Sequence, residues 1–272
     1  MKKKKKEIEL LKHIKRKTID YIEFSDDKMK NLNGVFPEKS SNEKFPPIKY
    51  KDIPKDHIPY LIWDTGYYMR GFAFNNNGMA CIMPLANPVL IYFNLAQMNL
   101  NEIYSLRKNL LDKFGHETSV KEKTLDTFYV FFGIASTFIV MLVTSLEAFV
   151  NSKIDKDFLY KIKDAEKCIK VYNIDQIQRW ISLEDKVSKI LNKCTNKIFA
   201  KKYPLSQEKI NQLINMRNEV IHTKTDNTYQ HYEQLYKDML KFKFDETIIA
   251  VRDFINYYDE NLIEQCPCGK DN

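Results

Sequence analysis

An uncharged run of 20 residues, from Thr127 to Leu146, limits the possible folds of this chain more than any other feature. Such a run is long enough to cross a lipid bilayer as one helix. It is interrupted by serines and threonines, however, and a glutamate follows at once. Its flanks lack the basic stop and the paired aromatic belts of a membrane helix. We therefore expect a core helix that is apolar all round, with a membrane anchor as the alternative.

Helical patterns dominate the chain after residue 100. Apolar residues recur at helical spacing in five segments, which we predict to be helices, with a linking region at 155–178: 101–115, 119–154, 182–198, 206–222 and 229–263. Ser182 begins a capping box with Asp185 at the start of the third, and Ser206 is the expected N-cap of the fourth. The predicted fold class is therefore mainly α, with a helical bundle at residues 101–265 and a tail at 266–272.

The first 100 residues are less regular. Residues 1–30 are predicted to form a basic amphipathic helix or arm, with the helix at about 5–24. Residues 31–100 read as a proline-punctuated extension or a small domain. The sequence NNNG at 75–78 lies between two apolar runs and is typical of a hairpin turn. We therefore expect a small α+β part ahead of the helices.

The formal charge of +7 comes from one end of the chain. Residues 1–17 carry nine lysines and arginines and two glutamates, and the other 255 residues hold 34 basic and 34 acidic side chains. A uniformly basic nucleic-acid-binding surface is therefore not supported. The lysine run is either a solvated terminus or an arm that contacts RNA phosphates or anionic lipid. With only 7 glycines, the chain also lacks a glycine-rich phosphate loop.

The five cysteines, without a secretory signal, favour a reduced, cytoplasmic protein. Cys266 and Cys268, in the sequence CPCG, are similar to the first half of a short zinc motif. Two thiolates separated by one residue do not complete a tetrahedral site. The sequence therefore predicts no metal and no cofactor, and it leaves open whether this pair binds a metal.

The most specific functional signal is MRNEVIHTK, residues 216–224. On a helix, Arg217 falls within an apolar arc made by Ile210, Leu213, Ile214, Val220 and Ile221. Burying an arginine without an anion is very costly. Glu147 is the one charge in the apolar stretch 127–152, so we expect it to pair with Arg217 and fix the packing of two helices. Asn151 lies one turn further on the same face.

A polar ridge runs beside this arginine. Four residues recur at helical spacing along it: Asn211, Asn215, Asn218 and His222. His222 falls in the last turn, where the helix dipole favours the imidazolium. An arginine that stabilises a pentavalent phosphorane, a histidine that moves a proton and an asparagine that positions an oxygen are sufficient for RNA cleavage without metal. The 2′-hydroxyl would attack its own phosphate, so DNA would be resistant.

These residues resemble the signature of the HEPN superfamily, in which a histidine follows an arginine after four to six residues. Here the motif is RNEVIH, with Arg217 and His222 at its ends. Two other blocks, SLEAFVN at 145–151 and WISLEDKVSKIL at 180–191, resemble helices that precede the motif in this superfamily. The three blocks come in the expected order, and the resemblance covers about residues 119–260.

The resemblance implies a helical bundle that forms a homodimer with two motifs lining one cleft. It also implies a metal-independent RNA endonuclease of anti-phage defence, abortive infection or toxin–antitoxin systems, whose products end in a 2′,3′-cyclic phosphate. Arg217 and His222 would be catalytic, and Asn218 would orient the reacting groups. Glu147 and Asn151 would support these residues. Four lysines would contact the RNA: Lys201, Lys202, Lys209 and Lys224.

The expected partners are RNA, a second copy of the chain, and an antitoxin or a phage-derived activator, with no membrane. Some HEPN proteins are inactive, so the main alternative is a non-catalytic scaffold for dimerisation or RNA binding. In that scaffold Arg217 would be engaged by Glu147. A membrane-anchored protein that uses residues 127–146 is the third reading.

Overall fold

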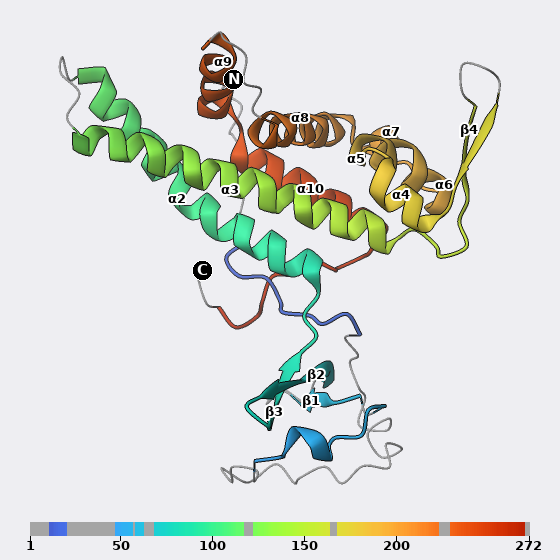
Figure 1. The fold of residues 1–272 in the computed structure, drawn as a ribbon. Coiled ribbons are helices and arrows are strands. Elements are labelled where there is room, and N and C mark those ends of the chain that lie inside the picture. Colours follow the sequence, from blue (N-terminus) through green and yellow to red (C-terminus); the bar gives the residue numbers. More distant parts are fainter. Residues whose placement is uncertain are drawn as a thin grey trace. The chain divides into compact units, whose positions relative to one another are not determined.

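The predicted mainly α fold, with a small N-terminal α+β part, is present in the computed structural model (Figure 1). The described residues are 11–20, 47–56, 58–62, 68–116, 122–163, 168–222 and 229–269. Contacts divide the chain into two units. The smaller unit is residues 16–87, and the helical unit is residues 1–15 together with 88–272.

The smaller unit is built on a three-stranded antiparallel sheet. Its elements are η1 (Tyr50–Asp52), β1 (Tyr60–Ile62), β2 (Tyr68–Asn76) and β3 (Met79–Pro84), with the strands in the order β1-β2-β3. The predicted hairpin is confirmed, because β2 and β3 are joined by a tight turn with Asn77 at φ 51° and Gly78 at φ 86°. These left-handed conformations suit asparagine and glycine. An ion pair of 2.6 Å between Arg70 and Asp20 ties the start of the unit to β2.

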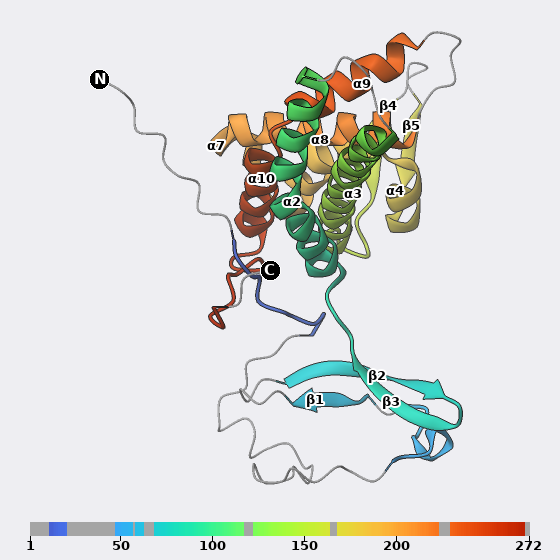
Figure 2. The ribbon, with the colours of Figure 1, turned by 90° about the vertical axis from the view of Figure 1, so that its left-hand side faces the viewer.

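The helical unit contains ten helical segments and a second hairpin among the residues described. In chain order they are α2 (Pro88–His116), α3 (Glu122–Ser152), β4 (Tyr160–Lys163), β5 (Ile169–Tyr172), α4 (Ile174–Trp180), α5 (Leu183–Asp185), the π-helical η2 (Lys186–Ile190), α6 (Leu191–Thr195), α7 (Phe199–Lys202), α8 (Pro204–Ile221), α9 (Gln230–Lys241) and α10 (Phe244–Tyr258). α2 and α3 run antiparallel, side by side. Figure 2 shows α10 beside α2, and α8 packs against both α3 and α10.

α3 supplies the centre of the helical core. Phe138 is 0% exposed and packs edge-on against Phe244 of α10, with ring centroids 5.2 Å apart. On the side toward α2, the buried hydroxyl of Ser145 donates a hydrogen bond to the carbonyl oxygen of Val89 at 2.7 Å. The uncharged run therefore forms the core helix that its composition indicated.

α3 is also the one helix, among the residues described, that is long and apolar enough to cross a membrane. Within residues 124–152, the most apolar stretch of 18 residues has a mean hydropathy of 2.0, and half of that stretch is buried inside the protein. The hydroxyls of Thr137 and Thr144 donate to carbonyl oxygens one turn back, at 2.9 and 2.8 Å. Such bonds satisfy a hydroxyl in either setting. Length and composition alone are weak support for a membrane span.

The predicted basic helix at 5–24 is wrong for residues 11–20. There the backbone is extended or irregular, and Ile14 forms a β-bridge with Gln265. The Ile14 side chain is 2% exposed and belongs to the helical core. Pairing with a distant segment thus replaces the local hydrogen bonds that the lysine-rich pattern favoured. The rest of the predicted helix lies outside the described residues.

Several predicted helix boundaries are also corrected. α2 begins at Pro88 instead of residue 101, and α8 begins at Pro204 instead of after Ser206. Proline is favoured in the first turn of a helix, where its missing N–H has no partner to lose. The single helix predicted at 229–263 is two helices, because the chain breaks at the buried Phe242.

The region around residues 155–200 is more structured than predicted. The linking region at 155–178 holds β4, β5 and the start of α4. Ser182 is confirmed as an N-cap, since its hydroxyl accepts from the Asp185 N–H at 3.2 Å. The helix that follows ends at Thr195, where Asn196 takes a left-handed conformation with φ 55°.

Phe138→Ala should lower the free energy of unfolding of the helical unit by about 3–5 kcal/mol, because it leaves a cavity in the core. Tyr129 on the same helix is 72% exposed, so Tyr129→Ala is a matched control with a change within about 0.5 kcal/mol. Urea unfolding followed by far-UV circular dichroism measures both. Equal losses in the two variants would contradict the role of α3 as a core helix.

Candidate active site

The predicted catalytic residues lie at the C-terminal end of α8. Earlier in this helix, Ile210, Leu213 and Ile214 are buried and hold it against the core. Val220 is only partly buried and Ile221 is 44% exposed. The apolar arc is therefore buried over its first half, and the last turn of α8 faces solvent.

Arg217 does not meet the anion that was predicted for it. Its side chain is partly buried, and its Nη1 donates a hydrogen bond to Asn218 Oδ1 at 3.2 Å. The predicted ion pair with Glu147 is wrong, because Glu147 Oε1 accepts from Lys186 Nζ at 3.0 Å. Within the part of the chain that is described, Asn218 is the side-chain partner of Arg217. Since the end of α8 is solvated, no burial penalty demands an internal counterion.

Lys186 is the buried charge that the sequence reading missed. Its side chain is 1% exposed, against 35% for Glu147, and its Nζ also donates to the carbonyl oxygen of Gln178 at 2.9 Å. Lys186 opens the π-helical segment and precedes Val187 and Ile190, both buried. That spacing places a lysine on an apolar face, which is the signal that could have identified it. The pair with Glu147 joins the end of α3 to the helix after α4.

Asn151 follows Glu147 by one turn of α3, as expected. Its Oδ1 is buried and has no hydrogen-bond partner among the described residues. Among the described residues, no hydrogen bond joins Asn151 to Arg217 or to His222. The structure therefore brings the two predicted supporting residues to Lys186 and the core, and not to the arginine.

His222 closes α8 with an exposed side chain. Its backbone N–H donates to the carbonyl oxygen of Asn218 at 2.9 Å, and its φ of −101° ends the helix. Asn218 is also exposed. Because Asn218 and His222 are four residues apart, they share one face, and the hydrogen bond from Arg217 draws the guanidinium toward it. A phosphate in solvent can approach all three side chains.

A groove of about 430 Å³ lies between α8 and α9. From α8 it is lined by Asn215 and Glu219, and His231 Nε2 of α9 lies 3.2 Å from Glu219 Oε2. Arg217 and His222 do not line it. Of the predicted polar ridge only Asn215 reaches this groove, so the groove is not a catalytic cleft within one chain.

The predicted RNA-binding lysines do not gather beside the motif. Lys201 and Lys202 are exposed on α7, before α8 begins. Arg217 lies roughly 20 Å along the axis of α8 from its start, at about 1.5 Å per residue. Lys209 forms an ion pair of 2.5 Å with a glutamate of α10. Lys224 lies outside the described residues, so the described lysines supply positive charge at the opposite end of α8.

Comparisons with protein-family models, with curated proteins and with solved structures found no match for this chain. The function therefore has to follow from the chemistry of the exposed residues on α8 and from the packing that presents them. The three blocks of the resemblance lie on α3, on α4 to α6 and on α8, and the first two are joined by the ion pair of Glu147 with Lys186.

Glu147→Gln should lower the free energy of unfolding by about 3 kcal/mol, because it leaves the buried ammonium of Lys186 without an opposite charge. Adding Lys186→Met should recover most of the loss, since an apolar side chain of similar length needs no charged partner. Urea unfolding measures both variants. The control is Lys189→Met, which breaks an exposed pair with Asp185 and should cost less than about 1 kcal/mol. Wild-type stability in Glu147→Gln would contradict the structural role of the pair.

Proposed function

We propose that this protein is a metal-independent endoribonuclease of HEPN type that arrests growth in bacterial anti-phage defence or in a toxin–antitoxin pair. The main support is the exposed end of α8, where Arg217, Asn218 and His222 lie together. The guanidinium remains available to a phosphate, because Glu147 is engaged by Lys186. A fully ionised arginine at such a position suits a developing phosphorane.

Each residue has a role in cleavage by the 2′-hydroxyl. His222 takes the proton of this hydroxyl or gives a proton to the departing 5′-oxygen. The 2′-oxygen bonds to phosphorus, the bond to the 5′-oxygen breaks, and Arg217 stabilises the charge on the equatorial oxygens. Asn218 holds the guanidinium through its Oδ1. The products are a 2′,3′-cyclic phosphate and a 5′-hydroxyl.

A homodimer follows from the same chemistry. Cleavage removes one proton and supplies another, and two imidazoles can divide these transfers, whereas each motif carries one. Two copies of α8 that face one cleft would provide two histidines and two arginines. We therefore propose that the active form is a dimer and that the RNA binds across both chains.

His222→Ala should lower the rate of RNA cleavage by about 10²- to 10⁴-fold, the range for removal of a general acid or base. His231→Ala is the matched control, because it removes a histidine of the neighbouring helix that lies against Glu219 and outside the motif. Purified proteins are incubated with total RNA, and the fragment ends are tested for 2′,3′-cyclic phosphate. A substrate with a 2′-deoxy sugar at the cut position should resist cleavage by the wild type and by His231→Ala, because it lacks the attacking hydroxyl.

A second candidate function is a non-catalytic scaffold for dimerisation or RNA binding. The distance between the described lysines and Arg217 favours it, since RNA held at one end of α8 need not reach the other. It predicts RNA binding that survives His222→Ala, without cleavage. Two results together would replace the ribonuclease proposal by the scaffold. Cells that express the wild type would keep intact RNA with and without phage infection, and the wild type and His222→Ala would be equally toxic.

The proposal also places the protein in the cytoplasm, where its RNA substrate is. The membrane-anchored alternative depends on α3 alone. Cell fractionation without detergent separates the two. Recovery of the protein only in the membrane pellet would overturn the cytoplasmic location.

A further inference from the structure

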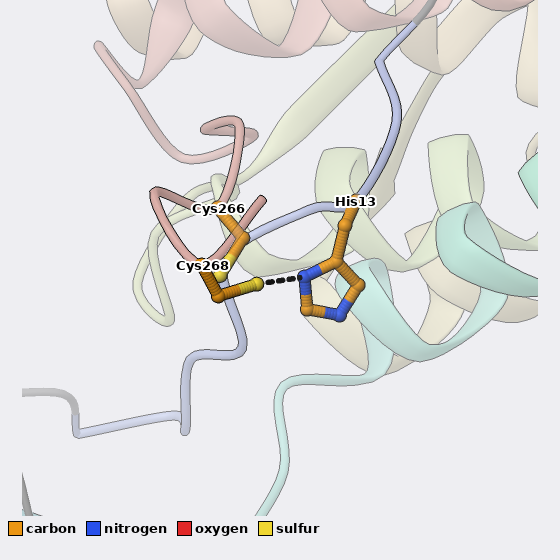
Figure 3. Close-up of side chains that lie close together, drawn as sticks. All are labelled: His13, Cys266 and Cys268. Atoms are coloured by element: carbon orange, nitrogen blue, oxygen red, sulfur yellow. Dashed lines mark hydrogen bonds between the residues drawn. The ribbon is translucent and has the colours of Figure 1, made fainter. Parts of the chain in front are cut away.

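We propose that His13, Cys266 and Cys268 bind a zinc ion that joins the N-terminal and C-terminal segments of the helical unit. Figure 3 shows the three side chains converging from the two segments. Their potential ligand atoms all lie within 4.8 Å of one another, and His13 Nδ1 is 3.1 Å from Cys268 Sγ. Cys266 and Cys268 belong to the CPCG motif, and His13 comes from the opposite end of the sequence.

The chemistry of this set selects zinc. Imidazole nitrogen and thiolate sulfur are the ligands that Zn²⁺ prefers in proteins. Bond lengths of about 2.3 Å to sulfur and about 2.0 Å to nitrogen place tetrahedral ligand atoms roughly 3.5–3.8 Å apart. The distance from His13 Nδ1 to Cys268 Sγ, 3.1 Å, is slightly shorter than this range, and no ligand atom is more than 4.8 Å from another. Small side-chain rotations would therefore let the three residues bind the ion. A water molecule takes the fourth position, since Cys268 is exposed.

Backbone pairing brings the ligands together before any metal binds. The N–H of Cys266 donates to the carbonyl oxygen of His13 at 2.6 Å, and the next residue, Ile14, forms a β-bridge with Gln265. Beyond the cysteines, Gly269 has φ 68°, a left-handed conformation that turns the chain. The histidine and the two thiols are therefore presented by two paired segments with a fixed register.

Both segments are themselves anchored to the helical core. Ile14 is buried in it, and the side chain of Gln97 on α2 donates to the carbonyl oxygen of Leu11. On the other segment, Ile263 is buried, and its N–H and C=O bond to the side chain of Asn256 on α10 at 2.9 and 3.1 Å. Ion binding therefore has little chain entropy to remove in the folded state. In the unfolded chain the same ion would have to close a very long loop, so it stabilises the fold.

Metal analysis of the purified full-length protein tests this site. Protein from zinc-supplemented medium should carry one zinc ion per chain. After chelation, Co²⁺ should produce the thiolate-to-cobalt charge-transfer band in the near ultraviolet and the intense visible bands of tetrahedral cobalt. His13→Ala, Cys266→Ser and Cys268→Ser should each lose these signals. Cys168→Ser, at an exposed cysteine outside the cluster, should retain them.

A thermal measurement separates loss of the site from loss of the fold. A strong chelator should lower the melting temperature of the wild type, and added Zn²⁺ should restore it. A variant at His13 or Cys268 that keeps the helical circular dichroism of the wild type should melt at the lower temperature with or without chelator. Zinc content unchanged in His13→Ala, a cobalt spectrum without thiolate charge transfer, or a disulfide between Cys266 and Cys268 in protein purified with reductant would overturn the proposal.

Discussion

The helical unit depends on one constraint, which is that α3 is too apolar to face water over most of its surface. Fully burying a side chain such as Phe131, Phe138 or Phe149 contributes about 1.5–3 kcal/mol each. Meeting that requirement takes more than one neighbour, and α2, α8 and α10 all pack against α3. α8 is held by its middle turns, where Ile210, Leu213 and Ile214 are buried, and its last turn is left in solvent. The exposed end of α8 is a consequence of how the core is covered.

The same constraint explains why the predicted partner of Glu147 was wrong. Helical periodicity assigns a residue to a face, but it does not say where along the helix the core ends. Arg217 shares a face with Ile210 and Ile214, yet it lies past the last buried turn. Lys186 shares a face with buried residues at a position that is enclosed, so its charge is the one that required an anion.

The sequence predicted the fold well where structure is determined by neighbouring residues. Asn77 and Gly78 form the expected turn, Ser182 caps its helix, and the uncharged run is a helix that supplies the core with its inner face. It failed where a distant segment decides. The lysine-rich pattern favoured a helix, whereas Ile14 pairs with Gln265, more than two hundred residues away. The candidate residues on α8 could be located from their spacing in the sequence alone. Their partners, and the approach of His13 to Cys266 and Cys268, depend on contacts between distant segments, which the spacing does not predict.

The exchange of partners also changes the balance between the two functional proposals. If Glu147 held Arg217, the arginine would need no function, because packing would account for it. With Glu147 held by Lys186, Arg217 has a neutral amide as its partner and keeps its charge for an external anion. An arginine at an exposed helix end is common, so the charge alone does not select catalysis. What favours the catalytic proposal is the hydrogen bond from Arg217 to Asn218, because Asn218 and His222 lie one helical turn apart on one face of α8. In the proposed mechanism two imidazoles divide the two proton transfers, so the ribonuclease proposal calls for a dimer, whereas RNA binding by a scaffold does not.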